Sequence, residues 1–136
     1  MACFTDSDQL YTVLGGFLRA QAGTEIARTI ARMGVCIQFK YHEPEALITL
    51  VAAGDDLEVV AGDDSHEPEV QFEMKADIAH RFWLGRVNLP VALARQQIIA
   101  RGPVQKALKL LPVIQPLYAR YEVHLRAMGR ADLVDV

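Results

Sequence analysis

One short segment limits the choice of fold more than any other: residues 70–75 alternate strictly between apolar and polar side chains. In an extended chain Val70, Phe72 and Met74 point to one side, and the polar residues between them point to the other. Such alternation is typical of a strand with one buried face and one face in water. The segments that follow carry bulky apolar residues and no catalytic pair. This part of the sequence therefore indicates burial of apolar surface.

Three further strands are predicted upstream of this one. Residues 35–42 also alternate with a period of two, and the apolar segments 47–53 and 57–61 are separated by the turn-forming residues 54–56. The polar cluster 62–68 then leads into the strand at Val70. We expect the first three strands to be antiparallel neighbours.

Two short helices and a fifth strand are predicted downstream. Asp77 is placed to begin a helix that ends at Gly85, and Asn88 with Pro90 begins the next. Ile98 and Ile99 follow as a short fifth strand.

The N-terminal residues predict a helical hairpin over residues 1–34. Side-chain oxygens in residues 5–8 can cap a first helix, and Thr24 can cap a second that ends at Gly34. Gly15 and Gly16 inside the first helix each cost about 1 kcal/mol relative to alanine. We expect another element to approach the helix closely at this point.

A helical tail is predicted over residues 112–136. Pro112 and Pro116 should kink or break it, because each removes a backbone donor and clashes with the preceding turn. Beyond them an amphipathic stripe lines up and ends at Gly129; its members are Ile114, Leu117, Tyr118, Tyr121, Leu125 and Met128.

Length and composition fit one domain with one core. The chain has 136 residues, of which 51% are hydrophobic, and no apolar run reaches the ~18 residues of a membrane-spanning helix. A formal charge of −3 with dispersed Lys and Arg argues against a nucleic-acid partner, and we expect at most transient contact with a membrane. Without a secretory or peroxisomal signal the expected location is cytoplasmic. Cys3 and Cys36 are expected to be free thiols.

Residues for metal, cofactor or covalent chemistry are poorly placed. The four histidines have no metal-ligand spacing, and the acidic segment 63–67 lacks the pattern of a calcium loop. Ser7 and Ser65 are the only serines, and neither lies in a nucleophile elbow. We therefore expect no catalytic residue, no metal and no cofactor, so the protein is not expected to be an enzyme.

The part of the chain between about Val35 and Leu111 resembles the sterol carrier protein 2 family, a single-domain lipid-binding fold. The residues that carry the resemblance are Glu69-Val-Gln-Phe-Glu-Met-Lys75, Ile78, Phe82-Trp-Leu-Gly85, Leu89-Pro-Val-Ala-Leu-Ala94, Ile98-Ile-Ala-Arg-Gly102 and Ala107-Leu-Lys-Leu-Leu111. The resemblance is specific because these segments occur together in this order, since no single segment is a catalytic motif. The chain departs from the family around the fifth strand and in its proline-broken tail, which leaves the ligand open.

The resemblance implies an α/β (α+β) domain: a five-stranded, mostly antiparallel sheet covered on one face by about five helices, with an apolar tunnel between them. Residues 1–34, 35–111 and 112–136 would be the hairpin, the sheet with its covering helices, and the tail. The expected ligand is a fatty acyl chain, a sterol-like molecule or an isoprenoid lipid. Its expected contacts are Phe72, Met74, Ile78, Phe82, Trp83, Leu93, Leu108, Leu111, Ile114, Leu117 and Tyr118.

Two functions remain open at this point. The first is non-catalytic binding and transfer of a hydrophobic ligand, for which the inward-facing residues would line a dry gap. The second is an accessory or dimerisation module for an enzyme of lipid or quinone metabolism, with a homodimer formed through the C-terminal helix. For any one of the apolar residues, ordinary core packing is the simpler interpretation.

Overall fold

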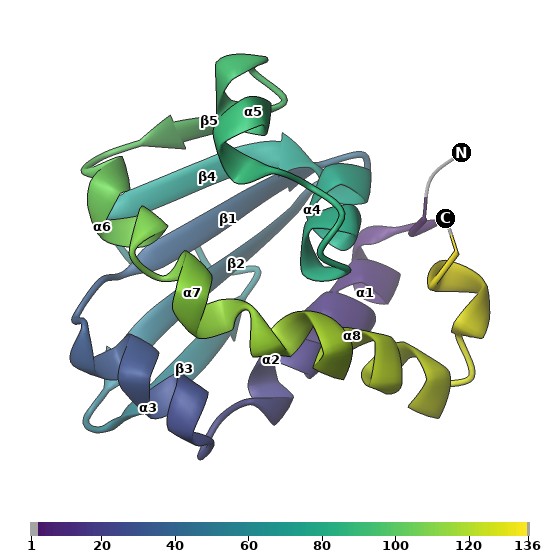
Figure 1. The fold of residues 1–136 in the computed structure, drawn as a ribbon, viewed down its shortest axis with the longest axis horizontal. Coiled ribbons are helices and arrows are strands. Elements are labelled where there is room, and N and C mark those ends of the chain that lie inside the picture. Colours follow the sequence, from purple (N-terminus) through teal and green to yellow (C-terminus); the bar gives the residue numbers. More distant parts are fainter. Residues whose placement is uncertain (1–2, 136) are drawn as a thin grey trace.

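A five-stranded open sheet forms the centre of the computed structural model, which describes residues 3–135 (Figure 1). The strand order is β3-β2-β1-β4-β5; only the central pair β1 and β4 is parallel. The predicted mostly antiparallel sheet is therefore confirmed. The strand bounds are β1 (Ile37–His42), β2 (Ala46–Ala53), β3 (Asp56–Ala61), β4 (Val70–Lys75) and β5 (Ile98–Arg101).

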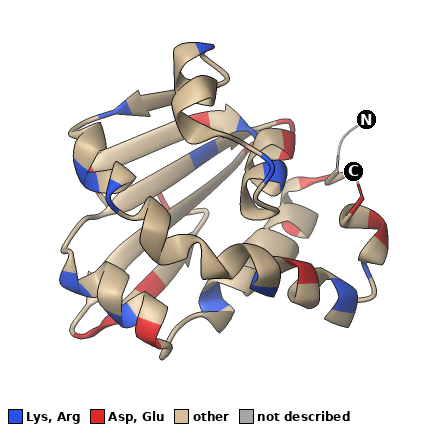
Figure 2. Ribbon diagram, viewed as in Figure 1, with Lys and Arg blue, Asp and Glu red and all other residues tan. Residues whose placement is uncertain are grey.

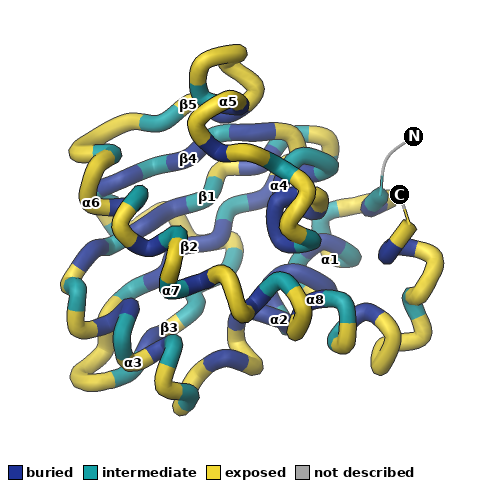
Figure 3. The backbone as a smooth tube through the Cα atoms, viewed as in Figure 1, coloured by how far each residue is buried: buried dark blue, intermediate teal, exposed yellow. Residues whose placement is uncertain are grey.

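The two faces of the sheet differ in chemistry. Phe39 pairs with Phe72 across the parallel ladder and with Ile48 across the antiparallel one, so these side chains share one face. Helices cover this apolar face, and Figure 3 shows buried residues concentrated in β1, β2 and β4, while the edge strands β3 and β5 are more exposed. The other face carries Gln38 and Thr49. Both are buried, and the Gln38 side-chain amide donates a hydrogen bond to the Thr49 hydroxyl at 3.1 Å.

The helices lie before, between and after the strands. They are α1 (Ser7–Leu10), α2 (Gly16–Ala20), α3 (Glu25–Arg32), α4 (Ala76–Trp83), α5 (Leu89–Ala94), α6 (Val104–Leu108), α7 (Leu111–Ile114) and α8 (Pro116–Ala127), with a π-helical turn η1 (Tyr11–Gly15) and a 3-10 turn η2 (Ala131–Leu133). Charged residues of both signs are interspersed over the ribbon in Figure 2. No helix within residues 3–135 is long and apolar enough to cross a membrane.

The N-terminal segments are capped as their sequence predicts. Asp6 accepts a hydrogen bond from the Gln9 amide at 2.8 Å, and Thr24 accepts one from the Ala27 amide at 3.3 Å. Helix α3 packs on β2, β3 and α7, while η1 and α2 pack on β3. Both segments expected to form the hairpin therefore lie against the sheet.

The expected close approach at Gly15 and Gly16 is wrong. A Cβ atom on either residue would meet nothing within 4 Å. The two glycines instead mark the point where the π-helical turn η1 gives way to α2, a local change of winding that periodicity alone does not reveal.

The prolines break the tail as expected. Pro112 lies in the first turn of α7 and Pro116 in the first turn of α8, where the missing N–H has no intrahelical acceptor to lose. Most of the apolar stripe packs inside this chain: Leu117, Tyr121 and Leu125 are at most 2% exposed. The α8 stripe thus completes the core of its own domain.

One glycine is required by a close approach. Gly102 follows β5 with φ of 96°, and a Cβ there would collide with the carbonyl oxygen of Glu69, just before β4. The end of β5 and the start of β4 can therefore approach each other only with glycine at this position.

Candidate functional site

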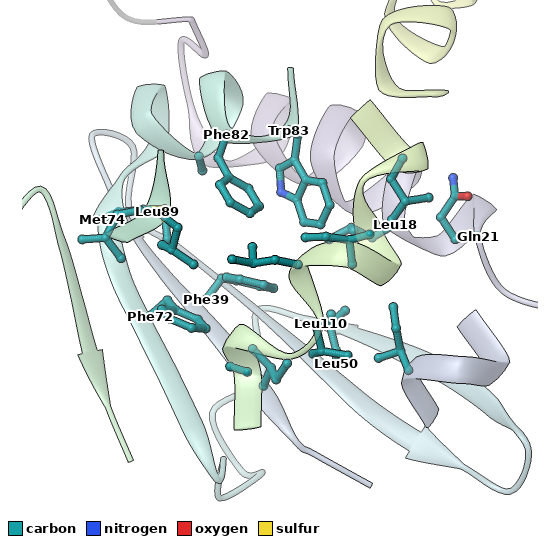
Figure 4. A pocket seen from close by; sticks show the side chains of 18 of the residues that line it. Leu18, Gln21, Phe39, Leu50, Phe72, Met74, Phe82, Trp83, Leu89 and Leu110 are labelled. Atoms are coloured by element: carbon teal, nitrogen blue, oxygen red, sulfur yellow. The ribbon is translucent and has the colours of Figure 1, made fainter. Parts of the chain in front are cut away.

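An apolar cavity lies between the covered face of the sheet and the helices (Figure 4). Its volume is about 60 Å³. The lining residues are Leu18, Gln21, Ala27, Ile30, Ile37, Phe39, Tyr41, Leu50, Leu57, Phe72, Met74, Ala79, Phe82, Trp83, Leu89, Ile98, Ala107, Leu110, Leu111, Ile114 and Leu117. Gln21 is the only amide among them, so the walls are almost entirely hydrocarbon and aromatic.

Helix α4 brings two aromatic rings over the sheet. The helix ends in a Schellman motif, in which the Arg86 amide bonds to the Arg81 carbonyl and the Gly85 amide to the Phe82 carbonyl, both at 2.9 Å. The Phe82 and Trp83 rings meet edge to face, with centroids 5.2 Å apart. Gly85 at φ 79° leaves room for the Tyr118 ring of α8, which a Cβ would contact at 3.0 Å. The helix end, the two rings and α8 are thus locked together.

The expected start of this helix needs a small correction. The residue that precedes α4 is Lys75, which makes no side-chain cap, and the helix begins at Ala76. Asp77 lies in the first turn, where its carboxylate accepts a hydrogen bond from the Cys3 amide at 2.8 Å. It therefore ties the N-terminal segment to α4 instead of capping the helix.

The roof of the cavity is made of three helical pieces. The residues that line the cavity from this side are Ala107 of α6, Leu110 between helices, Leu111 and Ile114 of α7, and Leu117 of α8. Helix α7 packs against α3 and α8. The sheet and the roof therefore meet chiefly through side chains around the cavity.

Seven of the eleven expected ligand contacts line this cavity: Phe72, Met74, Phe82, Trp83, Leu111, Ile114 and Leu117. Leu93 and Leu108 instead pack on the core from outside the cavity, and Tyr118 packs edge to face on Phe82 with centroids 6.0 Å apart. Ile78 borders a separate polar groove. Helix α6 ends at Leu108, and Leu110, two residues further on, lines the cavity in its place.

Several lining residues were missed from the sequence. Phe39 and Tyr41 alternate in register with Phe72 and Met74, so the β1 pattern contained a signal for them. Leu18 and Ile30 lie on the apolar stripes of α2 and α3, but helical periodicity does not tell which sheet residues a stripe will face. The contribution of the N-terminal helices therefore required the tertiary structure.

Two polar groups are buried near these walls. The Gln21 amide donates to the Phe17 carbonyl at 3.1 Å and accepts from Arg120 at 3.3 Å. The Tyr41 hydroxyl is fully buried and makes no hydrogen bond of good geometry among the described residues. Burial raises the pKa of this phenol far above its usual value, and the nearby Trp83 side chain lowers it in part. Tyr41 is thus the one wall residue with an unsatisfied polar atom.

A polar groove of about 490 Å³ lies at the end of β4 beside the start of α4. Its lining is His42, Glu73, Met74, Lys75, Asp77, Ile78, Arg81, Gln96, Gln97 and Ile99. Glu73 accepts from Arg101 at 2.7 Å and lies 2.5 Å from the Nε2 atom of His42. Arg101, then His42, lowers the pKa of Glu73 to about 2, and Glu45 with Glu73 raises the pKa of His42.

A metal centre is not supported by the side chains present. Within residues 3–135 no group of three or more His, Cys, Asp or Glu side chains is placed to hold a metal ion.

Comparison with known proteins gives matches at the level of structure. No family model matches this chain, and neither does any curated protein. The sterol carrier protein domain 2 of Helicoverpa armigera superposes with a TM-score of 0.60 at 17% identity, covering 83% of this chain and 87% of that one. This chain has the sterol carrier protein 2 fold.

Two other matches place the same fold in different settings. A structure described as UbiJ-SCP2 Ubiquinone synthesis protein has a TM-score of 0.51 at 14% identity, with 87% of this chain and 89% of that one covered. The sec-alkylsulfatase Pisa1 from Pseudomonas sp. has a TM-score of 0.55 at 13% identity over 63% of this chain. This chain corresponds to only 14% of the alkylsulfatase's length, so the sterol carrier protein 2 fold there is one part of a larger protein.

Proposed function

We propose that this protein binds and transfers a hydrophobic ligand, such as a fatty acyl chain, a sterol-like molecule or an isoprenoid lipid, without catalysing a reaction on it. The observation that supports the proposal is the cavity itself, whose walls are apolar on the sheet side and the helix side alike. Each CH₂ group moved from water into such a site gains about 0.8 kcal/mol. A long chain can therefore bind with no charged anchor.

The size of the cavity sets a condition on this function. Ligand pockets usually measure about 300–1,000 Å³, and even a benzene-binding cavity is about 150 Å³, whereas this one is about 60 Å³. A long-chain ligand therefore requires the roof of α6, α7 and the start of α8 to move away from the sheet. The breaks at Pro112 and Pro116 are suited to such a movement, because they divide the roof into short pieces.

The test is uptake of a fluorescent fatty acid by the delipidated protein, with Trp83 emission as a second signal, since Trp83 is the only tryptophan and borders the cavity. Leu110→Phe should fill the cavity and lower the affinity at least tenfold. Leu108→Phe is the matched control, because this neighbouring leucine lies outside the cavity, and it should bind as the wild type does. Absence of saturable uptake by the wild type, or equal binding by both variants, would contradict the proposal.

A second candidate is an accessory module for an enzyme that acts on a lipid or quinone, and the shared fold with the UbiJ-SCP2 Ubiquinone synthesis protein is compatible with it. A homodimer through α8 would have to use the outer side of the helix, where Val123 is 67% exposed, because the apolar stripe is already buried. Sedimentation equilibrium distinguishes the two: a monomer at all concentrations argues against dimerisation, and a dimer lost in Val123→Glu supports it.

A further inference from the structure

The apolar cavity and the polar groove meet at one residue, Met74. Met74 borders both spaces, and it is the only residue that does so. In Figure 4 it lies at the edge of the lining side chains, beside Leu89. Its neighbours in sequence, Glu73 and Lys75, border only the groove. Met74 is thus the residue at which hydrocarbon walls meet polar ones.

The antiparallel partner strand has the same division. Ile98 lies opposite Met74 and borders the cavity, whereas the next residue, Ile99, borders the groove and is 45% exposed. The boundary between the two spaces is therefore the end of the β4–β5 ladder. Methionine is unbranched and changes rotamer at low cost, so its movement would join the spaces without breaking a ladder hydrogen bond.

The acidic and the basic side chains around the groove differ in how far they are paired within the chain. Both acids are satisfied within the chain: Glu73 by Arg101 and His42, and Asp77 by the Cys3 amide. The Arg81 side chain makes no hydrogen bond or ion pair with any residue in 3–135, and the Lys75 side chain reaches only the exposed Glu43, at 3.5 Å. The donors that remain available to a ligand are therefore cationic.

Two side-chain amides add neutral donors on the opposite side of the groove. Gln96 and Gln97 follow α5 in a turn where Gln96 has φ of 59°, a conformation that costs a non-glycine residue about 1 kcal/mol or more. Their side-chain amides make no hydrogen bond to the residues that the structure describes. A carboxylate accepts hydrogen bonds from guanidinium and amide groups together, so this groove suits a small anionic group.

We propose that the groove is the headgroup subsite for a single-chain amphiphile with a carboxylate head, and that Met74 moves aside so that its apolar chain enters the cavity. This inference rests on the proposed function, because the chain of the amphiphile occupies the same cavity. Joining the groove to the cavity gives the chain a route inward, and the roof still has to move away from the sheet for a cavity of about 60 Å³ to hold a long chain. Arg81 binds the carboxylate head and so favours acids over alcohols, and the Met74 side chain controls entry of the apolar chain into the cavity.

The experiment compares two ligands with identical sixteen-carbon chains, palmitic acid and hexadecanol, at pH 8 by displacement of a fluorescent probe. The wild type should bind the acid about tenfold more tightly than the alcohol. Arg81→Gln should abolish this preference, chiefly by weakening binding of the acid. Arg32→Gln, an exposed arginine at the end of α3, is the matched control and should keep the preference.

Gating by Met74 is measured by stopped-flow association. Met74→Ala should bind both ligands several-fold faster, because the wall between the spaces is shortened. Equal affinities for acid and alcohol in the wild type, or a preference that survives Arg81→Gln, would overturn the headgroup subsite while leaving the proposed function intact. Binding of neither ligand would overturn both. An unchanged association rate in Met74→Ala would overturn the gate.

Discussion

The two faces of the sheet use the same alternating strands for different purposes. On the covered face Phe39 and Phe72 lie with ring centroids 6.1 Å apart, and the helices above them leave a cavity. On the opposite face the side chains form a hydrogen-bonded row, in which Gln38 joins Thr49 at 3.1 Å and Gln71 at 2.7 Å. Hydrogen bonds depend on direction, so each side chain of the polar row is held to particular partners. The apolar face is stabilised by burial, which does not depend on direction. Only the second kind of contact can rearrange around a ligand.

The largest expected effect comes from removing one ring of the covered face. Phe72→Ala should lower the free energy of unfolding by about 3 kcal/mol, because it deletes buried surface and enlarges an existing cavity. The neighbouring Gln71→Ala, on the polar face, should cost only about 1 kcal/mol through the lost hydrogen bond to Gln38. Urea unfolding of both variants measures the contrast, and equal losses would show that the two faces do not differ in this way.

A buried histidine on the helical side gives the next effect. The His80 Nδ1 atom lies 2.7 Å from the Tyr121 hydroxyl, and its Nε2 atom lies 2.7 Å from the Leu133 carbonyl, so neutral imidazole is satisfied at both nitrogens. His80→Phe leaves both partners buried and unpaired, which should cost about 2 kcal/mol at pH 7. Thermal unfolding at pH 7 checks the loss; a fully stable variant would contradict the role of this link between α4, α8 and η2.

The same histidine and His42 on the polar side should respond to pH in opposite directions. Burial lowers the pKa of His80, so the folded state binds its proton less readily and stability falls as pH drops below about 6.5. Glu45 and Glu73 raise the pKa of His42, so its contribution is present below pH 6.5 and lost as pH rises through the folded-state value. We expect each of the variants His80→Phe and His42→Gln to lose one of these two opposing pH dependences of stability. Unfolding free energies measured from pH 5 to 8 check this.

The smallest expected effect concerns the unsatisfied hydroxyl on the cavity wall. Tyr41→Phe removes a buried polar atom that has no partner among the described residues, so stability should be unchanged or rise by up to about 1 kcal/mol. A loss of more than 1 kcal/mol in urea unfolding would show that the hydroxyl contributes a hydrogen bond to the folded state.

The strands and the inward face of β4 could be predicted because alternation is a local property that directly encodes which side is buried. This alternation predicts the inward side chains of Phe72 and Met74, and the family resemblance adds Phe82 and Trp83 of α4; all four line the cavity. The roof was harder. Whether Leu108 or Leu110 faces the sheet depends on where α6 ends and how the chain turns into α7, which is decided by packing against distant residues.

The apolar stripe of α8 illustrates the same difficulty. A stripe that contains Leu117, Tyr121 and Leu125 can face its own domain or a second subunit, and its periodicity is identical in the two cases. In this chain it closes the core beside Phe17 of α2, whose ring lies 4.9 Å from that of Tyr121. The contact joins residues about a hundred positions apart, a distance over which sequence patterns carry no information on pairing.

The segmentation of residues 104–127 by Pro112 and Pro116 has a kinetic consequence. At these two positions the backbone has no amide hydrogen to donate, so the ladder of helical bonds is already interrupted before any movement begins. The barrier to loading and unloading should then be governed by how many apolar side chains are exposed for an instant, and hardly by unwinding of helical turns. Under the proposed function, the rate of ligand exchange would therefore depend on the size of the side chains in residues 110–117. Additives that strengthen or weaken helices would change this rate far less.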